Sequence, residues 1–184
     1  LLDLEVYPRD TILRLIEEVD DDIYETMEPL LSSTEIEKQI ISLRSLGLKQ
    51  DYRLLPWIKE YVNSDNEDLV EACLKAAYKL GDIGDDDYFK LLLTTKQSDS
   101  FEVRANLAQV LEKFRTEESR VELQELMTDP HWKVRYNAGQ SLLNHGSKGI
   151  IALSRQLHSS DQFAQDMAWQ ILHQEITFED LLNN

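Results

Sequence analysis

An internal repeat of 30 to 34 residues constrains the fold of this chain more than any other feature of its sequence. The segment IEKQIISLRSLG (residues 36–47) matches VEACLKAAYKLG (residues 70–81) at an offset of 34 residues. Three further copies begin at Val103, Val134 and Ala164, at offsets of 33, 31 and 30 residues. Repeats of this length are typical of solenoids, in which each copy buries its apolar face against neighbouring copies.

Each copy predicts two helices joined by a short turn. In the second copy, Val70, Leu74 and Ala77 follow the spacing of one helical face. A second apolar stretch follows in every copy, namely YRLLPWIKEYV, DYFKLLLTT, RVELQELM, GIIALSRQL and TFEDLLNN. We expect capping residues ahead of the first helices and turns at three glycines: Thr34, Ser64, Asp99 and Asp129 as caps, and Gly47, Gly81 and Gly146 as turns. A total of only six Gly and four Pro also favours an all-α fold.

The copies divide the chain at residues 32–63, 64–97, 98–127, 128–157 and 158–184. Residues 1–31 precede them and carry an apolar stripe of Ile12, Leu15, Ile16, Val19, Ile23 and Met27 with acids between these positions. We expect one long, acidic, amphipathic helix here, straight or bent at residues 20–22, that caps the first copy. The alternative is an arm that docks elsewhere.

The fourth copy identifies the repeat type. Its pattern D-x-x-W-x-V-R-x-x-A, continued to Gly146, resembles a HEAT repeat of the short bacterial kind that also occurs in phycobilisome lyases. The resemblance covers about residues 32–182. It implies a right-handed α-solenoid of about five helix pairs, with second helices that line a concave, protein-binding surface. It also implies that Trp132 packs between repeats and that Arg104 and Arg135 join an Asp–Arg ladder with Asp99 and Asp129.

The charge of the chain limits the classes of partner. The formal net charge is −16, and residues 1–31 contribute half of it with ten acids against two bases. So acidic a chain repels phosphate backbones, and it has no cluster of five or more Lys and Arg. We therefore expect no nucleic-acid partner and favour a protein or peptide, with a basic one as the natural match.

No pattern of metal-binding or catalytic residues stands out. The four histidines are separated by 14, 13 and 15 residues, so none of them pair on one helical face. The single Cys73 lies in an apolar helical register and is expected to be a buried hydrophobe. The acidic stretches at residues 63–69 and 82–89 lack the order of an EF-hand loop and suit helix starts. We expect no catalytic residues, no metal and no cofactor.

These observations favour a non-catalytic, cytoplasmic scaffold or adaptor that binds a protein on its second helices. The candidate partner-binding residues are Arg53, Trp57, Glu60, Lys90, Glu122, Glu125, Arg155 and Trp169. Trp57 is the leading hot-spot candidate, and Trp169 is expected either to cap the core or to be exposed. A lyase-like or DNA-glycosylase-like HEAT enzyme remains an alternative. Because the chain begins with Leu rather than Met, we expect it to be a fragment of a longer protein. No apolar run in it is long enough to span a membrane, so any membrane segment would lie upstream. In that alternative the chain is a tethering domain of a membrane-anchored protein.

Overall fold

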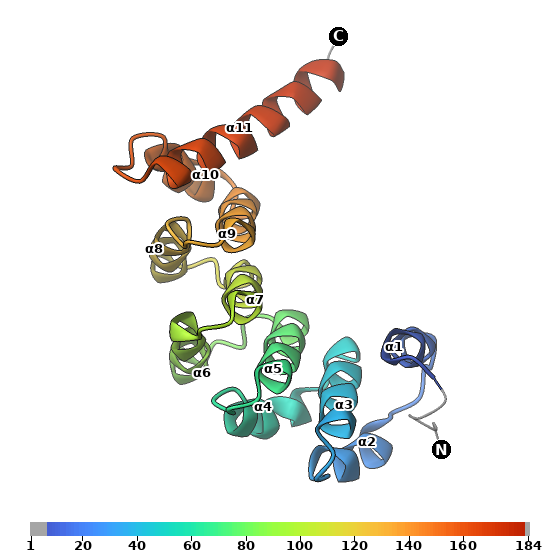
Figure 1. Ribbon diagram of the computed structural model, residues 1–184. Coiled ribbons are helices and arrows are strands. Elements are labelled where there is room, and N and C mark those ends of the chain that lie inside the picture. Colours follow the sequence, from blue (N-terminus) through green and yellow to red (C-terminus); the bar gives the residue numbers. More distant parts are fainter. Residues whose placement is uncertain (1–6, 183–184) are drawn as a thin grey trace. The chain divides into compact units, whose positions relative to one another are not determined.

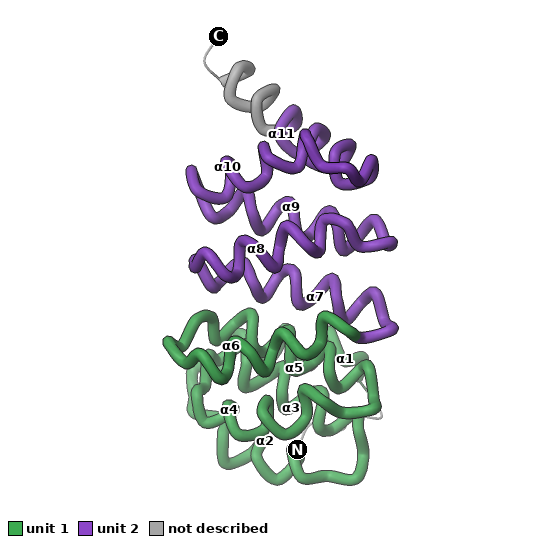
Figure 2. The backbone as a smooth tube through the Cα atoms, turned by 90° about the vertical axis from the view of Figure 1, so that its left-hand side faces the viewer, with its two compact units in different colours: residues 1–97 green, residues 98–184 purple. Residues whose placement is uncertain are grey.

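The computed structural model describes residues 7–182, with side chains described for residues 7–174. Eleven α-helices and two short 3-10 helices account for the regular structure of the described residues, and they contain no strand (Figure 1). The helices stack in repeated pairs, which confirms the predicted all-α solenoid. The chain divides into two compact units, Leu1–Gln97 and Ser98–Asn184 (Figure 2).

In the first unit, first and second helices of the copies alternate along the chain. The first helices α3 and α5 pack against each other, and α4 packs on α5. Their facing surfaces are apolar, with Leu43, Leu46 and Leu74 fully buried. The elements of this unit are α1 (Arg9–Glu17), α2 (Tyr24–Leu31), α3 (Ile36–Leu48), η1 (Tyr52–Leu54), α4 (Leu55–Tyr61), α5 (Glu67–Leu80), α6 (Asp86–Leu93) and η2 (Thr94–Gln97).

In the second unit, α9 lies at the centre. It contacts the first helices α7 and α11 and the second helices α8 and α10, and α8 also contacts α10. Val134, Ala138 and Leu142 of α9 are fully buried in these contacts. The elements are α7 (Phe101–Leu111), α8 (Glu117–Leu126), α9 (Trp132–Asn144), α10 (Ser147–Gln156) and α11 (Gln162–Leu182).

The single N-terminal helix expected over residues 1–31 is not what the described residues 7–31 form. Two helices occur there, and both pack on α3: α1 in the manner of a first helix and α2 in the manner of a second helix. The break has a local cause, because the Asp22 carboxylate accepts a hydrogen bond of 2.9 Å from the Tyr24 N–H and so starts α2. Lys49 donates to the carbonyls of Glu17 and Val19, which satisfies the end of α1.

The last copy also differs from the expected helix pair. Its predicted second helix, TFEDLLNN, continues α11 without a break as far as Leu182, and residues 183–184 lie outside the described part. The physical reason is the absence of any Gly or Pro between Gln162 and Leu182, so that no residue interrupts the helix.

The first helices begin later than the predicted caps. In each copy, the residue directly before the first helix donates its backbone N–H to a side chain two residues earlier in the sequence. The accepting side chains are those of Ser33, Ser64, Ser98, Asp129 and Ser159. Asn66 and Ser100 then cap α5 and α7 with their own side chains. The predicted cap Ser64 and the predicted cap Asp129 therefore each close a turn just before a helix. The predicted caps Thr34 and Asp99 do not occupy the N-terminal boundary position either.

Gly47 differs in role from the other two glycines predicted as turns. Gly81 and Gly146 have positive φ angles of 76° and 67° and end their helices. Gly47 lies inside α3, and the turn there is made by Gln50 at φ 52°. A Cβ atom on Gly47 would lie 2.8 Å from the Ala76 Cα atom, so this glycine lets α3 approach α5 closely.

Candidate interaction surface

The four candidate residues of the first unit do not form a free surface together. The Arg53 guanidinium binds Asp51 at 2.7 Å and Asp22 at 2.6 Å, and it also lies 4.2 Å above the Tyr24 ring. Trp57 is half-buried and packs against Tyr61, with ring centroids 5.9 Å apart. Arg53 therefore joins the N-terminal helix pair to the first copy, and Trp57 has a packing role within its own helix.

Glu60 and Lys90, the other two candidates in this unit, are exposed on α4 and α6. Beside Arg53, the loop between α1 and α2 borders an open hollow of about 380 Å³. Its lining is Asp20, Asp21, Asp22, Ile23, Lys49, Asp51 and Arg53. The hydrogen bonds that Arg53 donates to Asp51 and Asp22 raise the pKa of its guanidinium above the ordinary value.

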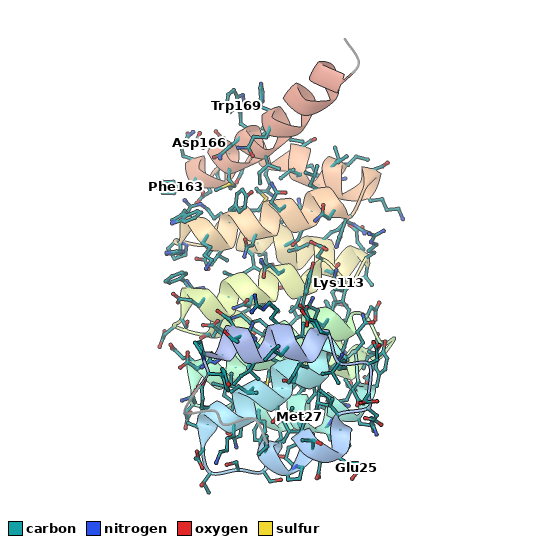
Figure 3. All side chains as sticks on the ribbon, turned by 90° about the vertical axis from the view of Figure 1, so that its right-hand side faces the viewer. Glu25, Met27, Lys113, Phe163, Asp166 and Trp169 are labelled. Atoms are coloured by element: carbon teal, nitrogen blue, oxygen red, sulfur yellow. The ribbon has the colours of Figure 1, made fainter. Side chains whose placement is uncertain are left out.

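In the second unit, three of the four candidates lie on the second helices. Glu122 and Glu125 belong to α8, and Arg155 belongs to α10. Trp169 instead lies on the first helix α11 beside Phe163 and Asp166 (Figure 3). Its side chain is 57% exposed and stacks on His173 with centroids 3.9 Å apart. Of the two expected roles for Trp169, the exposed one is therefore found, away from the second-helix surface.

Six exposed residues of α8 and α10 form a surface that we call the charge-reversed face. It consists of Glu118, Val121 and Glu125 of α8 and of Lys148, Ile151 and Arg155 of α10. Each residue of α8 in this set is 30 positions ahead of its equivalent in α10. The central pair is apolar, with Val121 44% exposed and Ile151 55% exposed. In the two pairs that flank it, the α8 residue is acidic and the equivalent α10 residue is basic.

The backbone beneath this face is held by buried contacts. Leu123 of α8 and Leu153 of α10, also 30 positions apart, are both fully buried. The Gln124 side-chain amide donates to the Ala152 carbonyl at 3.2 Å and links the two helices directly. The face is therefore carried on helices whose relative placement is set by packing, which favours a defined binding geometry.

Opposite charges on the two helices influence each other. The sequence of α8 contains four glutamates and one arginine, whereas α10 contains Lys148 and Arg155 and no acid. The pKa of Glu117 lies below its ordinary value, mainly because Arg120 donates a hydrogen bond to it, with smaller contributions from Arg155 and Lys148. The α10 side of the face thus presents positive charge in an otherwise acidic chain, a feature that the overall charge conceals.

Aromatic residues lie at the starts of the first helices in the same unit; Trp132 and Phe163 are exposed, and Phe101 is half-buried. Phe101, Trp132 and Phe163 recur every 31 residues, and Phe101 stacks on His131 with centroids 3.5 Å apart. Trp132 is 59% exposed, so the expectation that it packs between repeats is wrong. Its position as the first residue of α9 directs the ring outward, while Val134 takes the buried position. The sequence could have revealed this row of aromatic residues through their 31-residue spacing.

One rung of the expected Asp–Arg ladder is present among the described residues, between Arg104 of one copy and Asp129 of the next. Arg104 Nε lies 2.6 Å from Asp129 Oδ2, and both side chains are largely buried. Arg135 donates instead to the carbonyls of Asp129 and Pro130, and its guanidinium lies 4.8 Å above the Phe163 ring. These contacts fasten the helix starts to one another and have a structural role.

The described residues contain no group of three or more His, Cys, Asp or Glu side chains arranged to hold a metal ion. Cys73 is fully buried, and burial raises the pKa of its thiol well above the ordinary value. None of the helices within residues 7–182 is both long and apolar enough to cross a membrane.

Comparisons with known proteins agree with this architecture. A family model described as HEAT repeats matches residues 88–172. A crystal structure described as an engineered protein is similar at a TM-score of 0.57 and 20% sequence identity, over 91% of this chain and 83% of the other. At that level of identity the similarity concerns the fold alone. No curated protein matches the sequence.

Proposed function

Because this chain is a HEAT-repeat protein, we propose that it is a non-catalytic module that binds another protein through the charge-reversed face. HEAT repeats generally mediate protein–protein interactions. The observation that carries the proposal is the exposure of Val121 and Ile151 at equivalent positions on adjacent helices, between charged residues. An apolar centre with a charged rim is the usual composition of a protein interface.

The two halves of the face call for different chemistry in the partner. Glu118 and Glu125 favour basic groups, and Lys148 and Arg155 favour acidic groups. A purely basic peptide, the partner favoured by net charge alone, would match α8 and be repelled by α10. The proposed partner therefore presents apolar side chains flanked by both signs of charge.

The proposed surface differs from the set of eight candidate residues, because Glu118, Val121, Lys148 and Ile151 were not among them. It keeps Glu125 and Arg155, with Glu122 half-buried beside them. Arg53 and Trp57 are left out because their side chains already bind or pack within the first unit.

A differential capture experiment tests the proposal. The full chain and the variant Val121→Ser/Ile151→Ser are immobilised, and captured proteins are identified by mass spectrometry. The control variant Glu60→Gln/Lys90→Gln changes exposed second-helix residues outside the face. We expect at least one partner that wild type and control retain and the face variant loses. Equal capture by all three proteins would refute the proposed surface.

A further inference from the structure

The charge-reversed face is complementary to itself. Because α8 and α10 are equivalent helices of successive copies, they run in the same direction and place equivalent residues side by side. A twofold axis parallel to the two helices, midway between them and in the plane of the contact, turns a second copy over. This operation places α8 of the second copy opposite α10 of the first.

From this self-complementarity we infer that the charge-reversed face binds a second copy of this chain in a twofold-symmetric dimer. The inference rests on the proposed function and names its partner. Glu118 of one copy faces Lys148 of the other, Val121 faces Ile151, and Glu125 faces Arg155. Each of these contacts occurs twice, as in any isologous interface.

The same charges disfavour the other twofold arrangement of two copies. A twofold axis perpendicular to the helices would place α8 opposite α8 in reversed direction. Glu118 would then face Glu125, and Lys148 would face Arg155, so that every flanking contact joins like charges. Repulsion of this kind selects one orientation between two copies. The parallel arrangement satisfies all four flanking pairs at once.

Several features favour a second copy over an unrelated partner. A partner must supply both signs of charge at the spacing of Glu118 to Glu125 and of Lys148 to Arg155, seven positions along each helix. It must also place an apolar pair opposite Val121 and Ile151. The chain itself presents this pattern on rigid helices. Since the apolar centre is small and the rim is charged, the association is expected to weaken as salt is added.

Two charge variants of the full chain test the inference. In the first, Glu118→Lys/Glu125→Lys makes both helices basic; in the second, Lys148→Glu/Arg155→Glu makes both acidic. Each variant alone would place like charges opposite each other and is expected to be monomeric. An equimolar mixture restores opposite charges across the contact and is expected to form a heterodimer of the same mass as the wild-type dimer.

Sedimentation velocity at about 100 µM, well above micromolar dissociation constants, measures these species. Glu60→Lys/Lys90→Glu is the matched control and is expected to dimerise as wild type does; far-UV circular dichroism checks helix content. Heterodimer formation itself shows that both variants are folded. A monomeric wild type, variants that dimerise alone, or a mixture that stays monomeric would each overturn the inference. If wild type is monomeric and the Val121→Ser/Ile151→Ser variant still loses a partner that wild type captures, the proposed function stands and only the dimer is refuted.

Discussion

Replacing Gly47 by Ala tests the closest helix approach in the first unit. The added Cβ atom would lie 2.8 Å from the Ala76 Cα atom and 2.9 Å from its Cβ atom. Both distances are shorter than carbon–carbon contacts allow, and the nearer atom belongs to the backbone of α5. Because a backbone atom has no rotamer to change, α3 and α5 must move apart to accept the methyl group.

Two opposing effects set the size of the change. Overpacking a well-packed core destabilises by about 1–3 kcal/mol. Alanine inside a helix is favoured over glycine by about 0.5–1 kcal/mol, which offsets part of this loss. The helix separation would also loosen the burial of Leu43, Leu46 and Leu74. We therefore expect Gly47→Ala to lower the free energy of unfolding by about 1–2 kcal/mol.

Gly139→Ala is the matched control in the other unit. Its Cβ atom would meet Ile171 Cδ1 at 2.2 Å, and the next atom is the end of the Met127 side chain at 3.6 Å. Since Ile171 Cδ1 can move by rotation of its side chain, we expect a loss under about 1 kcal/mol. Urea unfolding followed by circular dichroism compares both variants with wild type. If Gly47→Ala is as stable as wild type, the close approach of α3 to α5 is refuted.

Three further changes test the other contacts. Arg104→Ala leaves the largely buried Asp129 carboxylate without its ion-pair partner, so we expect the free energy of unfolding in urea to fall by about 3 kcal/mol. The ion pair between Arg53 and Asp22 is exposed, and a loss for Arg104→Ala no larger than that for Arg53→Ala would contradict this. Burial lowers the pKa of His145 below its ordinary 6.5, so stability should be fully present above that pH and fall as pH drops below it. His145→Asn should show a smaller loss between about pH 7.5 and about pH 5.5, and equal losses would exclude this role. Trp132→Ala should change unfolding by only about 0.5 kcal/mol, since most of the ring is exposed, and a larger loss would restore a packing role.

The repeat was visible in the sequence because helical periodicity is a local property. Val134, Ala138 and Leu142 follow one face of a helix, and all three are fully buried. The all-α solenoid of helix pairs follows from such faces, since a single pair cannot bury its own apolar side. The Arg104–Asp129 pair likewise followed from positions that recur once per copy.

Details at the ends of elements were predicted less well. The helix starts lie beyond the expected caps, because Ser64 and Asp129 close turns and leave the capping position to a later residue. The N-terminal segment divides at Asp22, where a side-chain hydrogen bond competes with continuation of the helix. Both choices depend on which of several nearby polar side chains accepts a given N–H, and the sequence offered more than one.

The sequence by itself determined the helical periodicity, the repeat length and the buried face of each first helix. Only the tertiary structure decided that Arg53 is bound by Asp22, 31 positions away, and that Gly47 serves a close helix approach. It also decided that Val121 and Ile151 lie exposed on adjacent helices, Val121 between two acidic residues and Ile151 between two basic ones. The physical reason is that burial within one helix follows local spacing, whereas the surroundings of a surface side chain depend on which residues of a neighbouring helix lie beside it.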